Sequence, residues 1–329
     1  MIISRSPLRL SFIGGGSDLS AFYRRDVGAV LSAAINKYIY ITVNKKFDRK
    51  IRASYSITEI VDHVDELKHE LIREALRLVG LEGGVEITSI SDVPSEGTGL
   101  GSSSSYTVGL LKALYAYAGR HVGADRLAHE ACHIEIDICG KPIGKQDQYI
   151  AAYGGLQFLQ FNADDSVFVD PVICSPATRH ELQRMLLLFY TGVTRSANDL
   201  LADQRRNTES NGDTRLALQT MAAQARELRD ALVINDLGAF GEILHQGWLA
   251  KKKMANGISN GRIDEWYERA RRHGAIGGKI AGAGGGGFLL LCAPVDRHEG
   301  LRRALGELQP MEFRFEPQGS KIVFMEENG

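Results

Sequence analysis

The sequence lacks the features that would attach the chain to a membrane or a nucleic acid. No apolar run approaches the ~20 residues that a membrane-spanning helix needs, and the N-terminus has no hydrophobic segment of the signal-peptide kind. The formal net charge of the 329 residues is −1, so the chain has no basic surplus for nucleic acid. These absences predict a soluble, cytoplasmic protein with no membrane or nucleic-acid partner.

Cysteine is also scarce, and its spacing excludes the common metal motifs. The four cysteines are Cys132, Cys139, Cys174 and Cys292, and no two of them form a CxxC pair. Thiolate zinc sites depend on such pairs, so we expect none here. Free cysteine is often buried, and these four, which lie in apolar or mixed surroundings, are predicted to be reduced core thiols.

Glycine, by contrast, gathers in three clusters, at residues 14–16, 97–101 and 282–287. The middle cluster lies in the stretch PSEGTGLGSSSS, from Pro94 to Ser105, between a β-prone run at 85–90 and a helical pattern at 106–118. Glycines allow a ligand to approach the backbone closely, and a helix start offers unpaired N–H groups to an anion. The serines add hydroxyl donors and Mg²⁺ ligands. The stretch therefore predicts a phosphate-binding loop, although it does not match GxxxxGK[ST].

Two other motifs suggest rival functions. Residues 282–287 match GxGxxG, but a dinucleotide site needs a helix after the glycines, whereas residues 288–292 are strand-like. His129, Glu130 and His133 match HExxH, which on a helix could hold zinc with the glutamate as base. The longer metzincin pattern is absent, because Ile136 stands in place of its glycine. The alternative is an amphipathic helix whose histidines are surface residues or capped core residues.

The order of strand-like and helical patterns predicts an α+β fold with two domains, at residues 1–174 and 175–329. The patterns are strands near 8–12, 38–43, 85–90, 156–161, 166–172, 185–190, 288–293 and 320–325, and helices at 61–79, 106–118, 125–138, 216–232, 237–254 and 263–273. Asp125 is the expected cap of its helix and Gly80 the expected stop of the first one.

Two carboxylates fit phosphoryl transfer, which needs one on Mg²⁺ and a second near the attacking hydroxyl. Glu135 lies near the end of a predicted helix, and Asp147 follows a glycine turn. Arg9 lies in a strand, where it is either a surface residue or a fixed cation beside the transferred phosphate. Asp18 is either a helix cap or a ligand of sugar hydroxyls.

Together these segments resemble the GHMP kinase superfamily, and the resemblance covers essentially the whole chain. Its three motifs occur in order, as PLRLSFIGGGSD at 7–18, PSEGTGLGSSSS at 94–105 and KIAGAGGGG at 279–287. Glu135 and the stretch GKQDQ at 144–148 lie where the sugar kinases of this family have their magnesium glutamate and their aspartate. The resemblance implies an N-terminal domain like domain 2 of ribosomal protein S5 and a ferredoxin-like C-terminal domain.

The resemblance further implies an ATP-dependent phosphotransferase that requires Mg²⁺. Ser103 and Glu135 would hold the metal, Asp147 would be the base or an orienting group, and Arg9 would steady Asp147 and the transition state. The residues expected at the nucleotide are Pro94, Gly97, Gly99, Leu100, Gly101, Ser102, Ser103, Ser104 and Ser105.

The acceptor is expected to be a sugar phosphate. Galactokinases carry GEHxDY in the first motif, and this chain has GGSDL at 15–19 instead. The form IGGGSDL, together with GKQDQ, is most similar to heptose 7-phosphate kinases, which phosphorylate the C1 hydroxyl; fucokinases and galactokinases are the alternatives. Candidates for a cation at the distal phosphate include Lys251 to Lys253, and Lys145 and Arg195 are preferred. The residues expected at the acceptor are Gly15, Gly16, Ser17, Asp18, Lys145, Arg195, Gly284 and Gly285, in a monomer or a homodimer.

Overall fold

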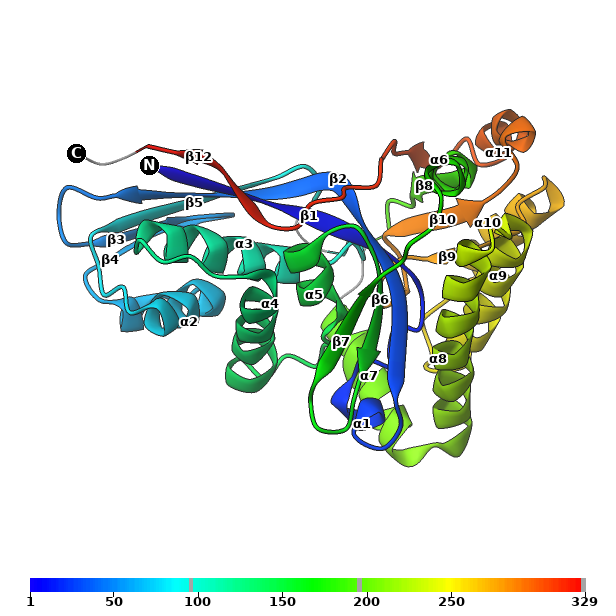
Figure 1. The fold of residues 1–329 in the computed structure, drawn as a ribbon, viewed down its shortest axis with the longest axis horizontal. Helices are drawn as coiled ribbons and strands as arrows, with labels where there is room; N and C mark the ends of the chain where they lie inside the picture. The colour runs from blue at the N-terminus through cyan, green and yellow to red at the C-terminus, as the bar shows by residue number, and fades with distance from the viewer. Residues whose placement is uncertain (95–96, 194–196, 327–329) are drawn as a thin grey trace.

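The computed structural model describes residues 1–94, 97–193 and 197–326, which form two β-sheets with helices packed against them (Figure 1). The first sheet has eight strands and the second has four, and strand pairs are antiparallel except for β3 with β5. This mixture of helices and largely antiparallel strands confirms the predicted α+β class.

The first sheet is organised around one long strand, β2, which has 18 residues. Along its length β2 pairs with β1, with β5 over residues 39–45 and with β6 over residues 28–33. The C-terminal strand β12 returns to this sheet and pairs with β1. The strands are β1 (Ile2–Ile13), β2 (Gly28–Lys45), β3 (Ile51–Ser54), β4 (Thr58–Val61), β5 (Val85–Ser91), β6 (Leu156–Phe161), β7 (Val167–Pro171) and β12 (Lys321–Met325).

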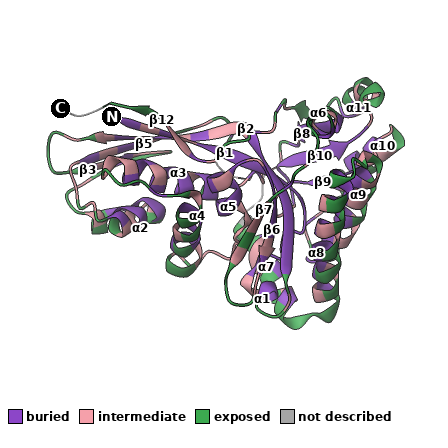
Figure 2. Ribbon diagram, in the orientation of Figure 1, coloured by how far each residue is buried: buried purple, intermediate pink, exposed green. Residues whose placement is uncertain are grey.

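Helices cover one face of this sheet (Figure 1). They are α2 (Glu70–Val79), α3 (Ser102–Tyr117), α4 (Ala124–Cys132), the π-helix η2 (His133–Ile138) and α5 (Gln146–Tyr153), with the short α1 (Ser20–Tyr23) after β1. The opposite face of the sheet is more open, since Ile90 of β5 and Phe324 of β12 are exposed (Figure 2).

The second sheet has the order β11-β8-β10-β9. Helix α9 packs on β9, and α8 packs on both α9 and β2, so this helix pair joins the two sheets. The elements are α6 (Pro176–Met185), β8 (Leu186–Tyr190), α7 (Ala197–Ser210), α8 (Gly212–Val233), α9 (Leu237–Lys252), α10 (Gly261–Arg272), β9 (Gly277–Ile280), β10 (Phe288–Cys292), α11 (His298–Ala304) and β11 (Gln309–Pro310). None of the helices in the described segments is long and apolar enough to cross a bilayer.

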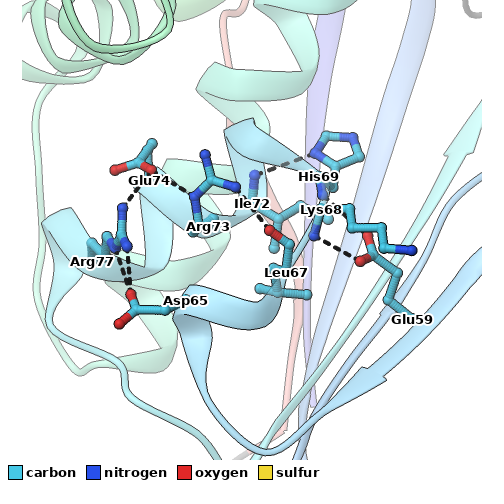
Figure 3. Close-up of polar contacts among 9 residues, drawn as sticks. All are labelled: Glu59, Asp65, Leu67, Lys68, His69, Ile72, Arg73, Glu74 and Arg77. Atoms are coloured by element: carbon cyan, nitrogen blue, oxygen red, sulfur yellow. Dashed lines mark hydrogen bonds and ion pairs between the residues drawn. The ribbon is translucent and has the colours of Figure 1, made fainter.

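The predicted helix at 61–79 is wrong in its first half. Residues 58–61 form β4, a 3₁₀ turn η1 occupies Val64–Glu66, and the helix begins only at Glu70. The Glu59 carboxylate accepts hydrogen bonds from the backbone N–H groups of Lys68 and His69, at 2.7 and 3.1 Å (Figure 3). The His69 ring then caps the helix by accepting from the N–H of Ile72. Because Glu59 binds the N–H groups of residues 68 and 69, and His69 caps the first turn, the helix does not extend further back.

Other boundaries also differ from the sequence patterns. Gly80 ends α2 with a φ of 77°, as predicted, but the cap of α4 is Gly123 and not Asp125, which lies in the first turn. Met185 ends α6 instead of opening the strand predicted at 185–190, so β8 begins at Leu186.

Candidate active site

A cleft of about 630 Å³ lies between the elements of the first sheet with its helices and the segment that contains α7, α9 and the glycine loop after β9. Its lining comes from β1, the glycine turn at 15–16, the loop at 97–101, the start of α3, the loop before α5, helices α7 and α9, and the glycine loop at 281–286. All three glycine clusters of the sequence therefore meet at one place.

Two of the glycine clusters touch backbone to backbone. A Cβ atom on Gly99 would lie 2.3 Å from the Ala281 carbonyl oxygen, and one on Gly282 would lie 2.5 Å from the Gly99 Cα. Gly99 and Gly101 also have φ angles of 73° and 78°, a region that favours glycine. Gly101 is the N-cap of α3, so the loop presents the start of a 16-residue helix to the cleft. Unpaired N–H groups there favour an anion.

Glu135 lies beside this helix start and is completely buried. Its carboxylate accepts a hydrogen bond from the Ser103 hydroxyl at 2.8 Å and another from the Gln148 amide at 2.7 Å. The Lys141 ammonium is 3.8 Å away. Burial raises the pKa of Glu135, and the charge of Lys141 and the hydrogen bond from Ser103 oppose this rise. The residue sits in the π-helical segment that continues α4, a feature often found at functional sites.

Arg9 and Asp147 both line the cleft and form a bidentate ion pair. The Arg9 Nε and Nη2 atoms donate to the two carboxylate oxygens of Asp147 at 2.6 and 2.7 Å. A third guanidinium nitrogen, Nη1, donates to the Gly99 carbonyl, and the backbone N–H of Arg9 donates to the Leu100 carbonyl. Arg9 thus fixes both the carboxylate and the glycine loop. A Cβ atom on Gly101 would be 3.2 Å from Asp147 Oδ2, so this carboxylate lies beside the N-terminus of α3.

Asp18 lies on the other side of Asp147, buried beside the turn at 14–16. Its carboxylate accepts hydrogen bonds from the backbone N–H groups of Gly16 and Gln146, at 2.8 and 3.2 Å. Burial raises the pKa of Asp18, the two backbone hydrogen bonds lower it, and the charge of Asp147 raises it. A Cβ atom on Gly144 would lie 1.9 Å from Asp18 Oδ2, so only glycine fits there.

Two of the serines expected at ligands bond the protein backbone. The Ser17 hydroxyl bonds the backbone of Gly14 and Ala29, and the Ser105 hydroxyl donates to the Pro7 carbonyl at 2.8 Å. Pro94, Leu100, Ser105, Ser17 and Gly285 are not among the residues that line the cleft, whereas Gly15, Gly16, Gly97, Gly99, Gly101, Ser102, Ser103, Ser104 and Gly284 are.

The structure does not favour Lys145 as the cation for a distal phosphate. Its ammonium bonds the Asp165 carboxylate and carbonyl at 3.1 and 3.2 Å and lies 4.8 Å from the Tyr23 ring centroid, outside the cleft lining. Asp165 lies in the β6–β7 hairpin. The sequence position of Lys145, close to Asp147, could not reveal this contact with Asp165. The second preferred residue, Arg195, lies outside the described residues.

Several cleft residues were given no role by the sequence patterns, and Lys251 was only one of several candidates for the distal phosphate. Ser11, Gln146, Gln204 and Lys251 line the cleft, and the buried Ser11 hydroxyl has no hydrogen-bond partner among the residues that the structure describes. Ser11 follows Arg9 by two residues on β1, so the alternation of the strand was a signal that could have found it. Lys251 and Gln204 come from helices distant in sequence, and no local pattern marks them.

Neither rival motif forms its expected site. The glycines at 282–287 join the antiparallel strands β9 and β10, and no helix follows them. His129 and His133 are exposed, and the His133 ring bonds Asp137 at 2.9 Å. Within residues 1–94, 97–193 and 197–326, no group of three or more histidine, cysteine, aspartate or glutamate side chains could hold a metal ion. A site shared by Glu135 and the Ser103 hydroxyl is not of that kind.

Comparison with known proteins gives consistent matches over the whole chain. Residues 64–155 match the GHMP kinases N terminal domain and residues 228–317 match the GHMP kinases C terminal region. The D-glycero-alpha-D-manno-heptose 7-phosphate kinase of Campylobacter jejuni is 30% identical over 97% of this chain and 98% of its own length. The structure of a D-glycero-D-manno-heptose 1-phosphate kinase from Bacteroides thetaiotaomicron superposes with a TM-score of 0.80 at 28% identity, covering 99% of this chain and 100% of that one. A putative sugar kinase from Campylobacter jejuni gives a TM-score of 0.78 at 29% identity, covering 98% of this chain and 97% of that one.

Proposed function

The chain belongs to the GHMP kinase family and is a phosphotransferase with a hydroxyl group as acceptor, and we propose that it transfers the γ-phosphoryl group of ATP to the C1 hydroxyl of a heptose 7-phosphate. The names of two relatives support the heptose phosphate, although one specifies the 7-phosphate and the other the 1-phosphate. Transfer to C1 of the 7-phosphate would give a 1,7-bisphosphate.

The helix start and its buried glutamate support a magnesium-nucleotide site. The N–H groups at the start of α3 and the hydroxyls of Ser102, Ser103 and Ser104 would bind the phosphates of ATP. Ser103 and Glu135 offer a hydroxyl and a carboxylate oxygen, the donor types that Mg²⁺ prefers. Magnesium, when bound, neutralises charge on the phosphate oxygens.

The Arg9–Asp147 pair would act on the acceptor. Asp147 would accept or orient the proton of the C1 hydroxyl, and Arg9 would hold the carboxylate in a single orientation while adding positive charge beside the transferred group. Phosphoryl transfer has a loose transition state, so the positioning of the hydroxyl matters more than the proton affinity of the carboxylate.

Asp18 and the turn at Gly15 and Gly16 would bind sugar hydroxyls. Asp18 already accepts two backbone hydrogen bonds, and a carboxylate can accept more than two. The unpartnered Ser11 hydroxyl is close by, since it lies 3.6 Å from where a Cβ atom on Gly15 would be. Such convergent polar groups are typical of a sugar pocket.

One observation carries the proposal: two carboxylates flank the same helix start, Asp147 in the cleft and bound to Arg9, and Glu135 buried behind it and bound to the cleft residue Ser103. The test is an ADP-release assay over free and phosphorylated hexoses and heptoses, with the product identified by phosphorus NMR. We expect the highest kcat/KM for heptose 7-phosphate and a new anomeric phosphate signal. Preference for a free sugar such as fucose, or phosphorylation at another carbon, would overturn the proposed acceptor.

A further inference from the structure

We propose that Lys251 binds the phosphate that the acceptor already carries, and so makes the site selective for sugar phosphates over free sugars. This inference rests on the proposed function and adds to it the residue that recognises the distal phosphate. It places that role on helix α9 instead of on Lys145.

The position of Lys251 is the first argument. Lys251 lies on α9, is 3% exposed and lines the cleft. The same chain segment reaches the acceptor side, because a Cβ atom on Gly16 would lie 2.7 Å from the Met254 Cε atom. The Lys251 ammonium donates to the Gly282 carbonyl, in the glycine loop that packs on Gly99. A different cation, Lys141, lies beside Ser103 and Glu135, the groups suited to Mg²⁺.

The pairing of charges is the second argument. The cleft-lining cations among the described residues are Arg9, Lys141 and Lys251. Arg9 is bound to Asp147 through two hydrogen bonds, and Lys141 lies 3.8 Å from Glu135. Within the described part of the chain, no carboxylate lies within ion-pair distance of Lys251, and its one hydrogen bond goes to a backbone carbonyl. An ammonium group has three donors, so two remain for a ligand.

Energetics also favour an anionic ligand. A buried charge without a charged partner is costly, and an incoming phosphate would compensate it through charge-assisted hydrogen bonds. Burial lowers the pKa of Lys251 to about 8, the nearby charge of Arg9 lowers it too, and those of Asp18 and Asp147 raise it. The amine is therefore still protonated at neutral pH and available to the phosphate.

The test compares two acceptors, heptose 7-phosphate and the free heptose, in three variants. Lys251→Met removes the charge and keeps the length, and Lys251→Arg keeps the charge. Lys253→Met makes the same change at the earlier candidate Lys253, which the structure shows to be exposed and outside the cleft lining. For Lys251→Met we expect kcat/KM to fall about 10- to 150-fold with heptose 7-phosphate, the range for one hydrogen bond to a charged group, and less than threefold with the free sugar. Lys251→Arg should recover part of the loss, and Lys253→Met should match the wild type with both acceptors.

Equal losses with both acceptors would overturn the inference, because Lys251 would then serve the transferred phosphoryl group or support the loop at Gly282. Thermal melting and magnesium-nucleotide titration of Lys251→Met, both expected to match the wild type, show whether the variant is folded. A misfolded Lys251→Met variant leaves the decision to Lys251→Gln, judged by the same ratio of acceptors. Failure of the proposed function is distinguishable, since it would appear as a wild-type enzyme that does not use heptose 7-phosphate at all.

Discussion

Replacing Arg9 by methionine tests how the central ion pair works. The change removes two hydrogen bonds to Asp147 and one to the Gly99 carbonyl. Hydrogen bonds to charged groups each contribute about 1.5–3 kcal/mol, but these three share one side chain and are not additive. The Asp147 side chain is 22% exposed, so water can replace part of what is lost. We therefore expect a loss of about 2–4 kcal/mol in transition-state stabilisation, or roughly 30- to 1000-fold in kcat.

The assay is single-turnover phosphoryl transfer at saturating nucleotide and acceptor, combined with a double-mutant cycle. If Arg9 acts through Asp147, the variant Arg9→Met with Asp147→Asn should be no slower than the slower single variant. Arg9→Lys should retain one contact and fall between the wild type and Arg9→Met. A near-native rate for Arg9→Met, or fully additive losses in the double variant, would refute the idea that the pair works as a unit.

Three further predictions address the metal, the acceptor and the pH dependence. Glu135→Gln should raise the Mg²⁺ concentration for half-maximal rate by about tenfold or more, because a carboxylate ligand is lost. The melting temperature should not fall, because the change removes a buried charge. An unchanged Mg²⁺ requirement would argue against a metal role for Glu135. Gly144→Ala should displace Asp18, because the new Cβ atom would lie 1.9 Å from Asp18 Oδ2. We expect a higher KM for the acceptor and an unchanged Kd for the nucleotide. An increase in both constants would indicate a general distortion of the cleft. Lys251 has a pKa of about 8 in an environment that contains Arg9, Asp18, Asp147 and Lys279, and it loses its charge as the pH rises. We therefore expect kcat/KM for a sugar phosphate to fall above pH 8 in the wild type but not in Lys251→Arg. The same decrease in both enzymes would assign the pH dependence to another group.

Local patterns in the sequence predicted which segments meet at the cleft better than they predicted where helices and strands begin and end. Glycines and serines before a helical pattern predicted the loop at 97–105, because steric freedom and the helix start are properties of neighbouring residues. Glu135 and Asp147 were predicted from their turn positions and the family resemblance, and the structure places both in or beside one cleft. Their catalytic roles remain predictions.

Side-chain direction and distant partners were beyond the sequence. Lys145 is adjacent to Asp147 along the chain, yet it turns towards Asp165 because the β6–β7 hairpin brings an opposite charge there. Lys251 reaches the cleft only because α9 packs on β9. The start of α2 was misplaced since the Glu59 carboxylate, eleven residues before Glu70, binds the backbone that would otherwise begin the helix. Each error comes from a tertiary contact that overrides a local pattern.

The most direct test of the account is the single-turnover rate of Asp147→Asn and Asp147→Ala with magnesium-ATP and heptose 7-phosphate. A positioned carboxylate contributes about 10²- to 10⁴-fold to such a step, so we expect both variants to lose at least about 100-fold in rate while they bind the nucleotide with unchanged affinity. Near-native rates in both variants would contradict the claim that Asp147 acts on the attacking hydroxyl.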